Sequence, residues 1–167
     1  VADFNNDGKQ DFASASNNAN TVSVRLGNGT GGFTGSTDVS VGTQPYAVKT
    51  GDFNNDGNQD FVTAAIGSNA LSVRLGNGLG GFTTVPNVAV GTSPYFVIVG
   101  DFNNDGNDDL AATAALSNTV YVRLGNGRGG FTNAPDVAVG TTPLGIALGD
   151  FNNDGNQDFV TAAQGTH

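Results

Sequence analysis

Four short segments rich in Asp and Asn share one spacing of oxygen-bearing side chains. Each segment follows the pattern Asp-x-Asn-x-Asp-Gly-x-x-Asp, so carboxylates stand at positions 1, 5 and 9 and an amide at position 3. Carboxylates this close repel one another unless a cation lies among them. Hard dications take oxygen ligands, and a flexible loop of six to eight oxygens favours Ca²⁺ over Mg²⁺, which requires a stricter octahedron. The spacing therefore predicts calcium sites.

The predicted ligands are the residues at positions 1, 3, 5, 7 and 9 of each loop. Position 7 can contribute its backbone carbonyl, which explains why a lysine is accepted there in the first loop, and the glycine at position 6 allows a tight turn. The predicted metal ligands are Asp3, Asn5, Asp7, Lys9 and Asp11; Asp52, Asn54, Asp56, Asn58 and Asp60; Asp101, Asn103, Asp105, Asn107 and Asp109; and Asp150, Asn152, Asp154, Asn156 and Asp158. We expect up to four Ca²⁺ ions per chain.

The net charge supports the same interpretation. The 167-residue chain carries fifteen acidic and six basic residues and a formal charge of −9, and twelve of the acidic residues, all of them Asp, lie in the four loops. Four calcium ions would bring the net charge close to neutral. An EF-hand is not expected, because position 12 lacks the required Glu and the flanking segments have strand character. A plain Asx-turn between strands is the alternative to a metal site.

The composition excludes several classes of function. With no cysteine and a single histidine, the chain cannot form a disulfide framework, a thiolate zinc site or a cysteine nucleophile. Few basic residues argue against a nucleic-acid partner, and the longest apolar run, 95–99, is too short for a membrane span. No acid–base pair stands apart from the loops, so we do not expect an enzyme.

Internal repeats determine the expected organisation. The hexapeptide Asp-Phe-Asn-Asn-Asp-Gly recurs every 49 residues, and segments 52–100 and 101–149 are identical at 29 of 49 positions without a gap. We therefore expect one repeat array over 1–167, with repeats 3–51, 52–100 and 101–149 and a partial repeat 150–167.

Each repeat is predicted to contain four short strands. Residues 21–26 alternate apolar and polar and precede an Asn-Gly turn, and a strand over 82–90 is interrupted by Pro86. The apolar run 95–102 predicts an inner, buried strand, and 60–65 the strand after the Asp-rich loop. Four antiparallel strands per 49-residue repeat predict an all-β fold of β-propeller blades, about 3.5 per chain, with a β-solenoid as the alternative.

The repeat resembles the FG-GAP/VCBS family of propeller blades, which also occurs in the integrin α-chain head. The resemblance rests on Asp-Phe-Asn-Asn-Asp-Gly-x-x-Asp between two strands and on Gly-Asn-Gly-x-Gly-Gly-Phe at the following hairpin, and it covers essentially the whole chain. It implies that the loop between the first two strands of a blade holds Ca²⁺ through positions 1, 3, 5, 7 and 9. Family propellers commonly have seven blades, so the resemblance implies either a longer propeller or an assembly of copies.

Other repeated residues receive structural interpretations. One arginine per repeat is expected on the outward face of a strand, bonded to a neighbouring carbonyl or Asp, and the Phe after each loop's first Asp is expected in the core. The less regular aromatic residues favour packing over stacking on sugars. The variable hairpin positions are candidates for binding a partner. These sets are Arg25, Arg74 and Arg123; Phe4, Phe53, Phe102 and Phe151; Tyr46, Tyr95, Phe96 and Tyr121; and 16–19, 65–68, 114–117 and 163–166.

The sequence thus predicts a calcium-binding propeller repeat module that acts as a non-enzymatic extracellular adhesion or recognition scaffold, secreted or at the cell surface. The alternatives are a carbohydrate-binding lectin and an engineered or recently amplified, self-assembling repeat propeller. The candidate partners are further copies of the chain that complete a ring, and a glycan or protein ligand, with no nucleic acid and no membrane span.

Overall fold

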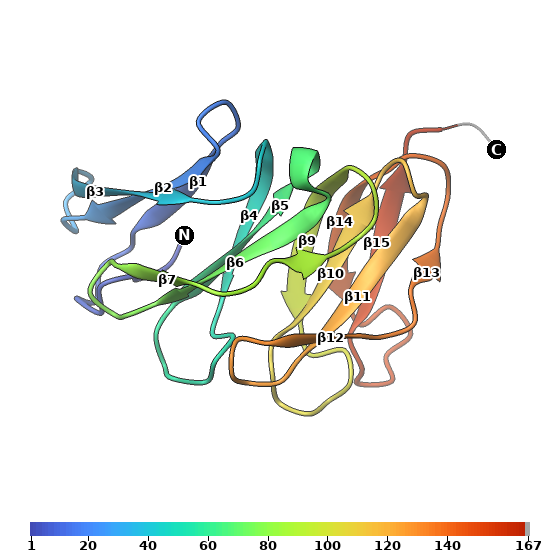
Figure 1. Cartoon of the computed structure of the whole chain (residues 1–167). Coiled ribbons are helices and arrows are strands. Elements are labelled where there is room, and N and C mark those ends of the chain that lie inside the picture. Colours follow the sequence, from blue (N-terminus) through green and yellow to red (C-terminus); the bar gives the residue numbers. More distant parts are fainter. Residues whose placement is uncertain (166–167) are drawn as a thin grey trace.

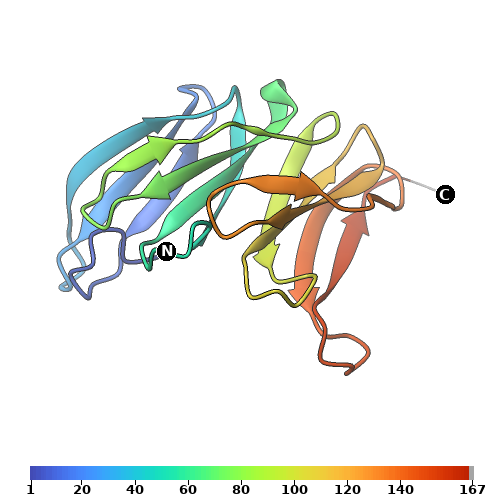
Figure 2. The ribbon, with the colours of Figure 1, turned by 60° about the horizontal axis from the view of Figure 1, so that its bottom comes forward.

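The chain forms four antiparallel sheets that follow one another along the sequence and pack face to face (Figures 1 and 2). The computed structural model describes residues 1–165, apart from the side chain of Ser36. Each sheet begins at an inner strand and continues outward through sequential hairpins. This is the arrangement of successive propeller blades, and it confirms the predicted all-β class.

The two central sheets have five strands each, whereas the first sheet has three and the fourth has two. The first sheet contains β1 (Phe12–Ser16), β2 (Thr21–Gly27) and β3 (Phe33–Ser40). The second contains β4 (Pro45–Gly51), β5 (Asp60–Ala65), β6 (Ala70–Gly76), β7 (Phe82–Thr84) and β8 (Val88–Ala89), with a short 3₁₀ turn at Ile66–Ser68. The third contains β9 (Pro94–Gly100), β10 (Asp109–Ala114), β11 (Thr119–Gly125), β12 (Phe131–Asn133) and β13 (Val137–Ala138). The fourth contains β14 (Pro143–Gly149) and β15 (Asp158–Ala163).

Proline divides the outer strand of the second and third sheets. β7 and β8 both pair with β6, and Pro86 lies between them; β12 and β13 are related to β11 in the same way. Proline has no backbone N–H to contribute to the ladder, so pairing stops there. The first repeat has Thr37 at this position, and β3 runs without interruption as one strand. The predicted interruption at Pro86 is therefore confirmed.

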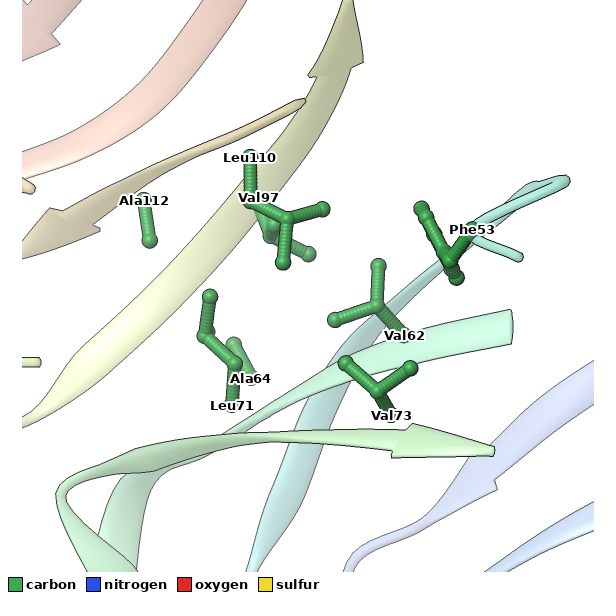
Figure 3. Packing of buried hydrophobic residues seen from close by; sticks show 8 residues of the cluster. All are labelled: Phe53, Val62, Ala64, Leu71, Val73, Val97, Leu110 and Ala112. Atoms are coloured by element: carbon green, nitrogen blue, oxygen red, sulfur yellow. The ribbon is translucent and has the colours of Figure 1, made fainter. Parts of the chain in front are cut away.

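The core consists of apolar layers between consecutive sheets. Figure 3 shows the largest layer, in which residues of the second sheet face residues of the third. Its buried members are Phe53, Val62, Ala64, Leu71, Val73, Val97, Leu110 and Ala112. The strands β5 and β10 are buried along their whole length, because each has a neighbouring sheet on both faces.

Arg74 and Arg123 lie between sheets rather than on an outward face, which corrects that part of the sequence prediction; Arg25, in the first sheet, is partly exposed and pairs with Asp38 as expected. Arg74 donates from Nε and Nη2 to the carbonyl of Ser40, and Arg123 donates from Nε to the carbonyl of Ala89. Both accepting carbonyls belong to the outer strand of the preceding sheet. The expected role in hydrogen bonding to a neighbouring carbonyl is confirmed, and the reach across the junction explains why the side chains are buried.

The core prediction holds for Phe4 and Phe53, which are buried, and is wrong for Phe151, which is exposed. The difference arises because, in the described residues, no sheet lies over the last of the four. Tyr46 is half exposed, although its ring contacts those of Tyr95 and Phe96. Within residues 1–165, no helix is long and apolar enough to cross a membrane.

We expect Leu71→Ala to lower the free energy of unfolding by about 2–5 kcal/mol, because the deletion leaves a cavity in a fully buried layer. Leu79→Ala is the matched control, since Leu79 lies in an exposed hairpin and its loss should cost less than about 0.5 kcal/mol. Chemical denaturation of both variants measures the difference. Equal losses would contradict the described core.

Candidate metal centre

Three of the Asp-rich loops connect the first two strands of a sheet, and the remaining loop precedes the first strand of the chain. Loop 3–11 precedes β1, and the other three connect an inner strand to its neighbour: 52–60 joins β4 to β5, 101–109 joins β9 to β10, and 150–158 joins β14 to β15. These three loops lie at the same end of their sheets in Figure 1. The fold therefore presents the predicted oxygen ligands in a row along one edge.

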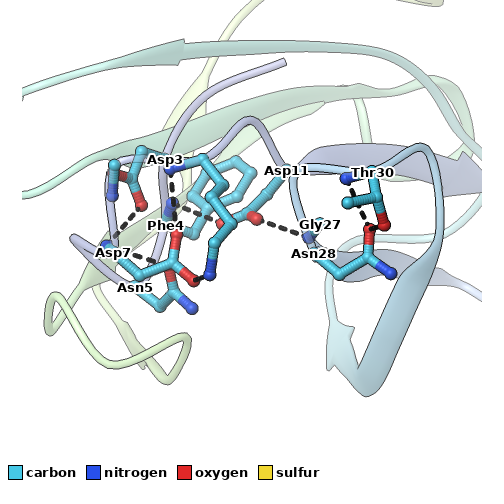
Figure 4. Close-up of polar contacts among 10 residues, drawn as sticks. Asp3, Phe4, Asn5, Asp7, Asp11, Gly27, Asn28 and Thr30 are labelled. Carbon is cyan, nitrogen blue, oxygen red and sulfur yellow. Dashed lines mark hydrogen bonds and ion pairs between the residues drawn. The ribbon is translucent and has the colours of Figure 1, made fainter.

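The carboxylate at position 1 accepts two backbone N–H groups of its own loop. In the first loop Asp7 donates to Asp3 Oδ1 at 3.1 Å and Gly8 donates to Asp3 Oδ2 at 2.7 Å (Figure 4). The same pair of bonds recurs in the other three loops. Gly8 has φ +79°, a conformation that favours glycine, so the predicted tight turn at position 6 is confirmed.

Positions 3 and 5 continue the turn with further side-chain bonds. Asp7 donates its N–H to Asn5 Oδ1 at 3.3 Å, and Lys9 donates its N–H to Asp7 Oδ1 at 3.0 Å. Bonds of this kind stabilise the ionised carboxylate. They lower the pKa of the position-5 carboxyls, mainly through the Lys9 side chain for Asp7 and through the Asn58 N–H for Asp56. These carboxyls are therefore negatively charged at neutral pH.

In the first three loops, the carboxylate at position 9 is buried and bonded to two separate parts of the backbone. Phe53 donates its N–H to Asp60 Oδ2 at 2.8 Å, and Gly76, at the end of β6, donates its N–H to Asp60 Oδ1 at 2.7 Å. Asp11 and Asp109 make the equivalent pairs of bonds. The sequence predicted position 9 as a metal ligand alone. The structure adds a second role, in which this side chain joins the start of the loop to the third strand.

The three carboxylates of one loop affect one another electrostatically. Burial raises the pKa of Asp60 to about 6; the two backbone bonds oppose this rise, and the charges of Asp56 and Asp52 add to it. The pKa of Asp109 is raised in the same way, by burial first and then by Asp105 and Asp101. The loops therefore hold their negative charges close enough to repel, which is the condition that a bound cation would relieve.

Neighbouring loops are joined by hydrogen bonds that the sequence reading missed. The amide at position 4 donates to the amide oxygen at position 7 of the next loop: Asn6 to Asn58 at 2.9 Å, Asn55 to Asn107 at 2.8 Å and Asn104 to Asn156 at 2.5 Å. Position 8 adds a second bond at two junctions, where Asp108 Oδ2 accepts the N–H of Asp52 and Gln157 Oε1 accepts that of Asp101. The asparagine at position 4 of every loop was the sequence feature that could have pointed to these bonds. In the structure its φ lies between 55° and 59°.

The chemistry of this donor set fits a hard dication. The side-chain ligands are carboxylate and amide oxygens only, and such oxygens suit Ca²⁺. In the described residues 1–165, no group of three or more acidic or histidine side chains converges as a metal cluster. The oxygens at positions 1, 3 and 5 instead accept backbone N–H groups. The loops thus bring the predicted side chains into the same turn, and their role as calcium ligands stays a prediction.

We expect Asp60→Ala to lower the free energy of unfolding by several kcal/mol. The change leaves the buried N–H groups of Phe53 and Gly76 without acceptors, at about 1–3 kcal/mol each. Asp158→Ala is the matched control, because Asp158 is only half-buried and accepts the N–H of an exposed Phe151. Denaturation in EGTA separates this effect from metal binding. A loss at Asp158 as large as that at Asp60 would contradict the structural role of burial.

The family model described as "FG-GAP-like repeat" matches the chain three times, over residues 3–63, 52–112 and 101–161. Each match begins at the first Asp of a loop, where the sequence analysis begins its repeats. No curated protein matches the chain.

Several solved structures share the fold. A functionally unknown protein from Desulfotomaculum acetoxidans DSM 771 is 20% identical with a TM-score of 0.56, over 72% of this chain and 36% of that one. BBS1N in complex with ARL6DN is 14% identical with a TM-score of 0.66, over 97% and 49%. The Photorhabdus luminescens Tc holotoxin pore is 16% identical with a TM-score of 0.51, over 90% and 8%. The chain spans less than half the length of each of these proteins, and at these identities the likeness concerns the fold alone.

Proposed function

Because the chain belongs to the FG-GAP-like repeat family, we propose that it is a calcium-binding propeller module that acts as a non-enzymatic scaffold for adhesion or recognition outside the cell. The observation that carries this proposal is a turn that brings carboxylate and amide oxygens together within one loop, in which Asp3, Asn5 and Asp7 all accept backbone N–H groups. Four loops with the same oxygen spacing repeat this turn.

The role proposed for the ion is structural. The oxygens at positions 1, 3, 5 and 9 and the carbonyl at position 7 would hold it, and its positive charge would offset the repulsion within the loop. Asp60 also accepts the N–H of Gly76 at the end of β6. An ion held by this carboxylate would therefore connect the β4–β5 loop to the third strand of the same sheet.

The proposed location rests on the calcium affinity that we expect for such loops. Extracellular modules with sites of this kind bind calcium with dissociation constants of about 10⁻⁴–10⁻³ M, which suit the concentration outside cells. We therefore place the protein in the secreted or cell-surface class.

The non-enzymatic role is supported by the acidic residues outside the loop ligands. Asp38 accepts from Ser23 and pairs with Arg25, Asp136 pairs with Arg123, and Asp108 accepts the N–H of Asp52. Each of the three is engaged in a structural contact.

Protein recognition is the proposed use of the scaffold. BBS1N, which shares the fold, was crystallised in a complex with ARL6DN, and this supports a protein ligand for a propeller of this shape. The candidate surface is formed by the exposed members of the predicted variable positions, at residues 17–19, 67–68, 116 and 163–164, whereas Ala65, Ala114 and Ala115 are buried. Residue 166 of that prediction lies outside the described residues. Residues in such loops vary without disturbing the sheets that carry them.

We expect calcium titration to show uptake of up to four ions per chain and a rise in melting temperature. A site occupied at 100 times its dissociation constant adds about 2.7 kcal/mol to the free energy of unfolding. Asp56→Ala should remove one ion, whereas Asp38→Ala should remove none, because Asp38 lies on β3 away from the loops. Isothermal titration calorimetry and melting with calcium, magnesium or EGTA measure this. An unchanged melting temperature in EGTA would contradict the proposal.

A second candidate function is carbohydrate binding, which one aromatic cluster favours. Tyr46 is 52% exposed, and its ring centroid lies 5.2 Å from that of Tyr95 and 5.6 Å from that of Phe96, both edge-on. Exposed aromatic rings offer apolar faces on which sugar rings stack. This cluster joins the starts of β4 and β9 on neighbouring sheets.

If carbohydrate is the ligand, Tyr46→Ala should weaken binding at least about tenfold, which corresponds to 1.4 kcal/mol. Tyr121→Ala is the control, because Tyr121 packs against Arg123 outside the cluster. A glycan array with added calcium identifies the sugar, and titration of both variants measures the loss. An array without any signal would count against this candidate.

A further inference from the structure

One side chain of the Asp-rich loops lies outside the predicted ligand set and bonds to the loop of the preceding sheet. It occupies position 8, which is Gln in three of the loops and Asp108 in the loop 101–109. Asp108 Oδ2 accepts the N–H of Asp52 at 2.9 Å, although the two residues are 56 positions apart in the chain. The same oxygen would lie 2.5 Å from a Cβ placed on Gly51. The carboxylate therefore fits closely against the start of the preceding loop.

The residue that accepts this contact is position 1 of the loop 52–60. The two carboxylate oxygens of Asp52 accept the N–H groups of Asp56 and Gly57, at 3.1 Å and 2.8 Å. The backbone of position 1 is thus held by the next sheet, and its side chain is held by its own loop. Four carboxylates belong to this loop or bond to it, namely Asp52, Asp56, Asp60 and Asp108.

The next junction has the same hydrogen bond without the charge. Gln157 Oε1 accepts the N–H of Asp101 at 2.8 Å and lies against Gly100, as Asp108 lies against Gly51. An amide oxygen and a carboxylate oxygen therefore occupy the same place and accept the same kind of N–H. The chain itself supplies the neutral equivalent of Asp108, so the two contacts differ mainly by one negative charge.

We propose that Asp108 raises the calcium affinity of the loop 52–60 from the neighbouring sheet, an inference that rests on the calcium binding proposed above. A carboxylate bonded to position 1 adds negative potential to a site for a dication and occupies none of its ligand positions. The affinity of calcium loops is tuned by the charge and the rigidity of the site. The affinity of one loop thus depends on a residue of the next repeat.

The test is a titration of the full chain with calcium chloride, followed through the backbone amide resonances of Gly57 and Gly106. These two glycines donate to position 1 of their own loops, so each reports on one loop. Asp108→Gln should move the half-saturation of Gly57 to calcium concentrations about two- to fivefold higher, the effect expected of one charge near a protein surface. Gln157→Asp should move the half-saturation of Gly106 to lower calcium by a similar factor.

Three controls separate the charge of Asp108 from its hydrogen bond. Asp38→Asn removes one negative charge on β3, away from the loops, and should leave both half-saturation points unchanged. Asp108→Ala removes the charge and the bond together and should weaken binding more than Asp108→Gln does. Added potassium chloride should reduce the difference between the wild type and Asp108→Gln, because salt screens charges.

The outcomes also separate this inference from the proposed function. If calcium shifts neither glycine resonance, both are wrong. If calcium shifts Gly57 with the same half-saturation in the wild type and in Asp108→Gln, only this inference is wrong. It is also overturned if Asp108→Gln weakens Gly106 as much as Gly57, because the charge then acts within its own loop. A loss confined to Asp108→Ala would overturn it too, since Asp108 would then act through its hydrogen bond alone.

Discussion

The buried carboxylate at position 9 of the first three loops is the interaction on which the rest of the structure depends. Its two oxygens accept N–H groups from the start of the loop and from the end of the third strand, so the loop cannot move independently of its sheet. Burying such a charge is costly unless its oxygens are hydrogen-bonded. The fold meets that cost with two backbone amides; burial raises the pKa of Asp60, and two further carboxylates nearby add to the rise. The side chain that joins the loop to its sheet is therefore also one of the predicted calcium ligands.

The repeat also explains why consecutive sheets pack in the same way. Phe4 packs on Phe82 where the first sheet meets the second, and Phe53 packs on Phe131 where the second meets the third. At both places a glycine N–H, of Gly80 or Gly129, donates to the carbonyl of the first phenylalanine of the pair. The arginines of the second and third sheets and the asparagines at position 4 cross these junctions as well. The gapless repeat therefore makes the two junctions nearly equivalent.

Local patterns predicted much of the fold. The strand 60–65 was found with its bounds, and Pro86 interrupts the outer strand as expected. The inner strand β9 ends at Gly100, two residues before the predicted end, because the N–H of Phe102 bonds to Asp109 instead of continuing the ladder. The face of Arg74 and Arg123 was predicted to be exposed, but the preceding sheet covers it. Alternation shows which residues share a face but not whether another sheet covers that face.

The sequence by itself determined the repeat length, the strand positions, the turn glycines and the spacing of the loop oxygens, because each depends on residues close together in the chain. Only the tertiary structure decided which of these groups are buried and what they contact. Asp60 bonds to Gly76 sixteen residues away, and Arg74 reaches a carbonyl 34 residues before it. Phe53 and Phe151 occupy the same place in their repeats, yet one is buried and the other exposed. The physical reason is that the burial of a side chain depends on whether a neighbouring sheet covers it, and a local sequence pattern carries no information about that neighbour.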